Sequence, residues 1–165
     1  MTIECTLSRQ SLENAADELL KYAESLKGKT EKFVQSLGEK CAESARSNLI
    51  HIDTGNTRDS IQFIQEGTNG IVSVGGAAVW IEFGTGVKKN RSAGTYVHPK
   101  AEELGMSAIG TYDKGHGADP NGWWYPYDGG YRHTYGIEYN PFMYKASQEI
   151  RREMLNMAKE AYKID

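Results

Sequence analysis

The segment VWIEFGTG, Val79 to Gly86, places one acidic residue inside an apolar run and ends that run on Gly-Thr-Gly. Trp80 and Phe83 stand three residues apart, which predicts a short helical turn ended by Gly84 rather than a strand. Glu82 within this turn is open to three interpretations: part of a ligand-binding loop, a catalytic carboxylate, or a polar residue at the end of a buried segment. The surrounding sequence decides between them.

On the N-terminal side of this segment the sequence predicts a β-hairpin. Ile61 and Phe63, then Val72 and Val74, alternate with polar residues on either side of Gly67-Thr68-Asn69-Gly70. Alternation with a period of two is typical of a half-buried strand, and Asn-Gly between two such strands is the strongest short signal for a hairpin turn. We therefore expect two antiparallel strands here.

Apolar residues recur with the spacing of an α-helix near both ends of the chain. Two N-terminal helices are expected, the first ending at Gly28 and the second beginning at Thr30 as its N-cap. A C-terminal helix is expected to be capped by Asn140, with Pro141 in its first helical position. The apolar positions of the three stripes are, in order, Leu12, Ala16, Leu19, Ala23 and Leu26; Val34, Leu37, Cys41, Ala45, Leu49 and Ile52; and Phe142, Ala146, Ile150, Met154, Met157 and Ala161.

On the C-terminal side, a polar, glycine-dotted region predicts a long loop, and two aromatic-rich arms around Asp128-Gly129-Gly130 predict a second hairpin. Pro126 in its first arm favours an edge position. We expect one α+β domain, with two N-terminal helices and a C-terminal helix packed on a small, mainly antiparallel sheet. Its parts are a helical region 1–52, a turn, hairpin and short apolar segment 53–86, a long loop 87–121, an aromatic hairpin 122–139 and a helix 140–165.

Composition narrows the class of protein. The 165 residues carry a net charge of −3, which leaves no basic excess to follow a phosphate backbone, so nucleic acid is not expected as the principal partner. No apolar run approaches the roughly 20 residues of a membrane span, and the N-terminus lacks signal-peptide features, so we expect a cytoplasmic protein before any assembly and no membrane contact. Cys5 and Cys41 are expected to be free thiols.

Enzymatic chemistry finds little support in the residue pattern. None of the four histidines has zinc-site spacing, and no nucleophile elbow or complete phosphate-binding loop is present. A carboxylate pair for Glu82 would need Glu66 or Asp53, for which sequence provides no distance. We expect no catalytic residue, no metal and no cofactor. The remaining enzyme hypothesis is a metal-dependent hydrolase built around His98, His116, Asp119 and His133.

Aromatic residues are concentrated in the second hairpin. They are Trp123, Trp124, Tyr125, Tyr127, Tyr131, Tyr135 and Tyr139, more than one hairpin can bury beneath itself. Tryptophan and tyrosine combine a large apolar area with a polar tip, which suits an interface with protein or with a flat sugar. A protein interface and a carbohydrate-binding module that stacks sugars on Trp123 and Trp124 therefore both remain open.

Three motifs in order carry a resemblance to a known family. They are DTGNTRDSI (Asp53 to Ile61), VWIEFGTG, and GWWYPY followed by HTYGIEYNPFMYKA (His133 to Ala146). Together they resemble the tail-completion, or head–tail joining, proteins of long-tailed bacteriophages and prophages. The positions that match the family's structural motifs are Gly55, Arg58, Glu82, Gly84, Gly86, Pro141 and Phe142.

The resemblance implies a non-enzymatic structural protein of the virion, located at the neck. Such proteins are expected to form a ring, as a hexamer, and to contact the tail tube or tail terminator protein on one side and the head connector on the other. Contacts are expected from Trp123, Trp124, Tyr125, Tyr127, Tyr131 and Tyr135, with Lys88, Lys89 and Arg91 as a loop patch toward acidic partners or passing DNA. Glu82 is expected to pair with Arg58, and Gly84-Thr85-Gly86 to lead into the long loop.

Overall fold

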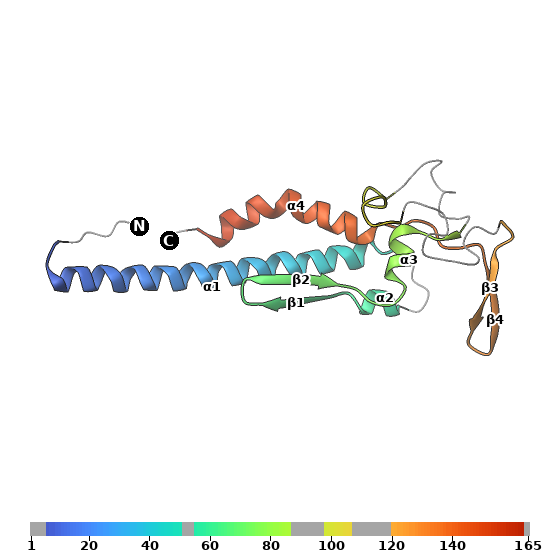
Figure 1. The fold of residues 1–165 in the computed structure, drawn as a ribbon, viewed down its shortest axis with the longest axis horizontal. Helices are drawn as coiled ribbons and strands as arrows, with labels where there is room; N and C mark the ends of the chain where they lie inside the picture. The colour runs from blue at the N-terminus through green and yellow to red at the C-terminus, as the bar shows by residue number, and fades with distance from the viewer. Residues whose placement is uncertain (1–5, 51–54, 87–97, 107–119, 164–165) are drawn as a thin grey trace.

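One helix of 40 residues, α1 (Arg9–Asn48), runs along the length of the molecule (Figure 1). The computed structural model describes residues 6–50, 55–86, 98–106 and 120–163. At 1.5 Å per residue α1 spans about 60 Å. Ser8 is its N-cap, whose hydroxyl accepts a hydrogen bond from the backbone nitrogen of Ser11 at 3.3 Å. The expected division into two N-terminal helices is therefore wrong. The first predicted stripe and the second as far as Ala45 lie on α1, Leu49 is its C-cap, and Ile52 lies outside the described residues.

Gly28, where the first helix was expected to end, lies inside α1. Glycine stops a helix by adopting positive φ, and Gly28 does not do so. Within a helix it costs about 1 kcal/mol relative to alanine, which a long helix tolerates. Thr30, expected as an N-cap, instead donates its hydroxyl to the Leu26 carbonyl one turn earlier at 2.8 Å.

The C-terminal helix α4 (Phe142–Ala161) lies antiparallel on the second half of α1 (Figure 1). In the first half of α4, Glu149 accepts hydrogen bonds from Ser44 and Asn48. Near its end, Tyr162 reaches the Thr30 hydroxyl at 2.7 Å, and its ring meets Phe33 edge-on. The covered part of α1 therefore extends from about Thr30 to its C-terminus.

The predicted first hairpin is confirmed as β1 (Gln62–Glu66) and β2 (Asn69–Ser73), preceded by the short helix α2 (Asn56–Asp59). Its two-residue loop is Gly67-Thr68, whereas the Asn-Gly pair belongs to β2. Gly70 is needed there for packing, because a Cβ atom would lie 2.6 Å from the Phe63 ring. The same ring covers Gly38 of α1, so glycines on both sides make room for one aromatic side chain.

The core lies where α1, α4, the first hairpin and the short helix α3 (Ala78–Phe83) meet. The helical turn that was predicted in the segment Val79 to Gly86 is thus confirmed as α3. Phe142 and Ile81 fill the centre, and small residues on α1 let the helices approach closely. The buried apolar cluster consists of Ala42, Ala45, Leu49, Ile61, Ala78, Ile81, Phe142 and Ala146.

The aromatic hairpin forms a second, separate antiparallel sheet from β3 (Trp123–Tyr127) and β4 (Gly130–Thr134). Its loop is Asp128-Gly129, at the predicted turn. In Figure 1 this hairpin extends away from the helical body, beyond α3. The α+β class is confirmed, but of the helices at the two ends of the chain only α1 packs against the β1–β2 hairpin, whereas α4 packs on α1.

Candidate functional site

Glu82, at the end of α3, caps the N-terminus of α4 from inside the protein. Its Oε2 atom accepts a hydrogen bond from the backbone nitrogen of Met143, and its Oε1 atom accepts one from the backbone nitrogen of Tyr144, both at 2.9 Å. The first N–H groups of a helix have no partner within the helix, and the positive end of its dipole favours a carboxylate. Glu82 therefore supplies the cap that Asn140 was expected to provide.

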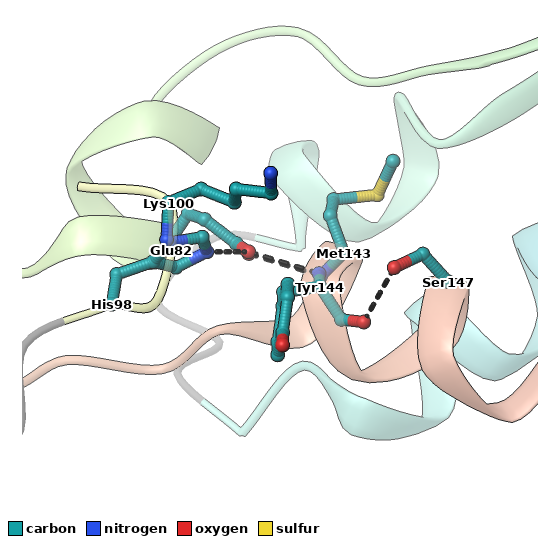
Figure 2. Close-up of polar contacts among 6 residues, drawn as sticks. All are labelled: Glu82, His98, Lys100, Met143, Tyr144 and Ser147. Atoms are coloured by element: carbon teal, nitrogen blue, oxygen red, sulfur yellow. Dashed lines mark hydrogen bonds and ion pairs between the residues drawn. The ribbon is translucent and has the colours of Figure 1, made fainter. Parts of the chain in front are cut away.

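His98 completes this arrangement, as Figure 2 shows. Its Nε2 atom lies 3.0 Å from Glu82 Oε1, and its Nδ1 atom accepts a hydrogen bond from the backbone nitrogen of Lys100 at 3.0 Å. Because Nδ1 is an acceptor, Nε2 carries the hydrogen and donates a hydrogen bond to Glu82. His98 is only 6% exposed and lies 4.4 Å, centroid to centroid, from the Phe83 ring. The pair joins three segments of chain and is covered from solvent.

The expected ion pair between Arg58 and Glu82 is not formed. Arg58 donates from Nη2 to the Arg46 carbonyl at 3.2 Å, while both Glu82 oxygens are occupied at the start of α4. Arg58 therefore connects the α2 turn to α1. The turn itself begins at Gly55, whose φ of 82° is in the left-handed region that glycine tolerates.

Asn140 is almost completely buried and caps the end of α1 rather than the start of α4. Its Nδ2 atom donates to the Asn48 carbonyl at 3.1 Å, and its Oδ1 atom accepts from the Ile50 nitrogen at 2.9 Å. The first bond satisfies a carbonyl that the helix leaves unpaired at its C-terminus, and the second holds the chain just beyond the helix. Pro141 then takes the N-cap position of α4, one residue before the position expected for it.

Gly84, Thr85 and Gly86 were expected only to lead into the long loop. In the structure they also cross the segment 135–139 and pack directly against it. Thr85 donates its backbone nitrogen to the Ile137 carbonyl at 2.8 Å, and its hydroxyl accepts from the Ile137 nitrogen at 2.9 Å. A Cβ atom on Gly136 would lie 2.0 Å from the Thr85 carbonyl oxygen, and one on Gly86 would lie 2.5 Å from the Tyr135 carbonyl oxygen. We call this contact the segment crossing.

The segment crossing supports the base of the aromatic hairpin, and the hairpin's outer residues lie open. Trp124 is 66% exposed and Tyr131 is 75% exposed, and Tyr127 and Tyr135 are also exposed. Rings contact one another along this surface: His133 lies 4.9 Å from both Trp124 and Tyr135. The sequence-predicted contact residues on the hairpin therefore divide into an exposed group and a half-buried pair, Trp123 and Tyr125.

The half-buried pair lines a pocket of about 480 Å³ between the hairpin and α3. Trp80 and Thr85 contribute to its wall on the α3 side. Neighbouring residues of a strand point to opposite faces, so Trp123 lines this pocket while Trp124 lies on the other face beside His133. The carbohydrate hypothesis requires the two tryptophans to form one stacking platform. Because they lie on opposite faces of the hairpin, they do not form one.

The histidines of the hydrolase hypothesis lie in different places. His98 is at the buried α3–α4 junction and His133 is on β4, while His116 and Asp119 lie outside the described residues. Among the described residues no three His, Cys, Asp or Glu side chains are grouped so that they could hold a metal ion. Burial raises the pKa of the Cys41 thiol, and the charge of Glu149 raises it further, which opposes a role as a nucleophile.

Several predicted residues fall outside the described part of the chain, among them the loop patch Lys88, Lys89 and Arg91. No helix in the described part is long and apolar enough to cross a membrane. With the geometry established, the chain was compared with models of known families, with curated proteins and with solved structures. Nothing matched. The function is therefore inferred from the motifs and the exposed surface alone.

Proposed function

We propose that this chain is a structural protein of a phage virion, which completes the tail and joins it to the head connector through protein contacts in a ring. The proposal rests on the three motifs and on where their residues lie. Glu82 caps the helix that Pro141 and Phe142 begin, and Gly84 and Gly86 lie at the segment crossing, so these motif residues have structural roles. In this role the protein needs no catalytic residue and no cofactor.

The observation that carries the proposal is the exposed aromatic hairpin. Trp124 and Tyr131 leave most of their surface in solvent on a narrow two-stranded sheet that extends away from the core. Large aromatic side chains at such a place are typical of residues that become buried when a partner binds. A protein partner suits this surface because the polar ring of His133, opposite Trp124 across the hairpin, lies beside the exposed aromatic side chains.

The partners we propose are the neighbouring subunit of a hexameric ring, the tail tube or tail terminator protein, and the head connector. A ring needs a heterologous contact, in which one patch of each subunit meets a different patch of the next. The face of the aromatic hairpin that carries Trp124 and Tyr131 provides one such patch. The virion neck is the proposed location, reached from the host cytoplasm, and the Lys88, Lys89 and Arg91 patch is proposed to face DNA passing through the ring.

The proposal is tested first by gene neighbourhood and then by the interface itself. Portal, head-completion and tail genes beside this gene are expected, and their products should bind the purified chain in pull-down assays. The double substitution Trp124→Ser with Tyr131→Ser should abolish that binding or ring formation while leaving the circular dichroism spectrum intact. Ile71→Ser, which changes an equally exposed residue on the other hairpin, is the matched control.

Two results would contradict the proposal. One is unimpaired ring formation and partner binding by the double variant. The other is a saturable change in tryptophan fluorescence on titration with a glycan panel, which would favour the carbohydrate hypothesis instead.

A further inference from the structure

The apolar stripe of α1 continues far beyond the part that α4 covers. Leu12, Ala16, Leu19, Ala23 and Leu26 recur at steps of four and three, and the same steps lead to Thr30 and Phe33. Those last two residues contact Tyr162 at the end of α4. A repeat of 3.5 residues is the spacing that keeps one face of a helix toward a partner helix. We call the face from Leu12 to Leu26 the open seam.

The open seam has no partner among the described residues of this chain. Leu12 is 48% exposed and Leu19 is 56% exposed, and beside them Leu20 is 63% exposed. In Figure 1 this half of α1 extends past both α4 and the β1–β2 hairpin. A lone helix of this length exposing leucine on one face is stabilised in water mainly by packing that face against something.

The charges beside the open seam indicate what covers it. Glu13, Leu20 and Lys27 follow one flank of the seam at intervals of seven residues. Consider two copies of α1 packed antiparallel, with the Leu20 residues of the two copies side by side. Glu13 of each copy then lies beside Lys27 of the other copy. One helix thus supplies both signs of charge in the order that antiparallel self-pairing requires.

The same register matches the sizes of the seam residues. Ala16 then faces Leu26 of the second copy, and Leu19 faces Ala23, so every layer sets a small residue against a large one and the helices can approach closely. A parallel pair would instead set leucine on leucine and alanine on alanine, with no opposite charges along the flanks. The antiparallel arrangement is therefore the favoured one.

We propose that two copies of this chain dimerise through the open seam, as an antiparallel helix pair with Glu13 of one copy beside Lys27 of the other. Leu12 of the second copy then lies beside Thr30, where α4 ends, so the stripe of α1 is covered along its full length. This contact has two-fold symmetry and uses none of the aromatic hairpin.

Sedimentation equilibrium of the full chain over a wide concentration range tests the dimer. The wild type is expected to show a reversible monomer–dimer equilibrium. Leu19→Asp should raise the dissociation constant by about a hundredfold or more, because two leucines per dimer lose their burial. Leu155→Asp, which changes an exposed leucine of α4, is the control and should leave the constant unchanged.

Charge reversal tests the register. Glu13→Lys or Lys27→Glu alone should weaken the dimer by about tenfold, and the double variant should recover it. Glu13 also pairs with Arg9 within the helix, and the double variant does not restore that pair, so recovery reports only the contact between copies. Reversing Glu18 and Lys21, which face away from the seam, is the matched control.

The proposal is overturned by a chain that stays monomeric at high concentration, by a dimer that Leu19→Asp does not weaken, or by a double charge variant weaker than either single one. An oligomer that survives Leu19→Asp but is lost with the hairpin double variant would overturn this dimer while leaving the proposed ring in place. The two proposals therefore fail independently.

Discussion

The Glu82 carboxylate lies 3.0 Å from the Nε2 atom of His98, and the same carboxylate receives the first two free N–H groups of α4. Three donors thus converge on one buried side chain. This single group fixes the end of α3, the segment around His98 and the start of the C-terminal helix.

Replacing Glu82 by glutamine should destabilise the protein by about 1–3 kcal/mol, because the amide nitrogen cannot accept a hydrogen bond and leaves at least one buried donor unsatisfied. Urea unfolding followed by circular dichroism measures the change. Glu66→Gln, on the exposed end of β1, removes the same charge and should have an effect below about 0.5 kcal/mol. Equal effects of the two substitutions would show that the carboxylate does not cap α4.

Two glycines of α1 should respond in opposite directions to alanine. A Cβ atom on Gly38 would lie 2.1 Å from the Phe63 ring, whereas a Cβ atom on Gly28 meets nothing within 4 Å. We expect Gly38→Ala to cost about 1–3 kcal/mol through overpacking, and Gly28→Ala to stabilise by about 0.5–1 kcal/mol through helix propensity. Thermal and urea unfolding of both variants provide the comparison. A stabilising Gly38→Ala would mean that the first hairpin is not held against α1.

The segment crossing leads to a third prediction. Gly136→Ala should cost more than about 3 kcal/mol, because its φ of 101° is strained for alanine and its Cβ atom would meet the Thr85 carbonyl oxygen. Gly129→Ala has a similarly positive φ of 79° but open space around it, so it should cost only about 1–2 kcal/mol. The difference in unfolding free energy between the variants isolates the steric contribution of the crossing, and a difference near zero would argue against the crossing.

Stability should also depend on the protonation of Glu149. Hydrogen bonds from Ser44 and Asn48, and after them the charges of Arg152 and Lys145, lower the pKa of this carboxyl. A lowered pKa in the folded state means that the stabilisation is present above the unfolded pKa and is lost as the pH falls through the folded one. Between about pH 5 and pH 3 the wild type should therefore lose slightly more stability than Glu149→Gln.

The difference for Glu149 should stay below about 1 kcal/mol because the side chain is largely in water. Urea unfolding at a series of pH values measures it. Glu18→Gln, an exposed change on α1 away from α4, controls for the loss of one charge. Parallel pH profiles of wild type and Glu149→Gln would remove the proposed contribution.

Local patterns in the sequence predicted most elements, because alternation, helical periodicity and turn residues act over a few neighbours. They placed both hairpins, the α3 turn and α4, and the Asp128-Gly129 loop came out as expected. The continuity of α1 was missed, because a glycine and a good capping residue at Thr30 look like a helix boundary when the covering helix is not known. Tyr162, which lies against Thr30, is 132 residues away in the sequence.

The junction around Glu82 was predicted only in part, and for the same reason. An acid among apolar residues indicates that a partner is needed, but the sequence does not specify that the partners are His98 and the start of α4. Arg58 was the nearest basic candidate in a motif, yet it bonds to Arg46. His98 in turn sits beside Lys100 in a polar stretch, so nothing local signals that its ring is buried.

Thr85 and Ile137 stand 52 residues apart in the chain but touch at the segment crossing. The segment 135–139, which directly follows the aromatic hairpin, is consequently tied to the chain just after α3. The outer part of that hairpin contributes nothing to the buried cluster around Phe142. Evolution, or a protein engineer, can therefore exchange the hairpin tip for one of different length or sequence, and so address a different partner, without redesigning the scaffold that carries it.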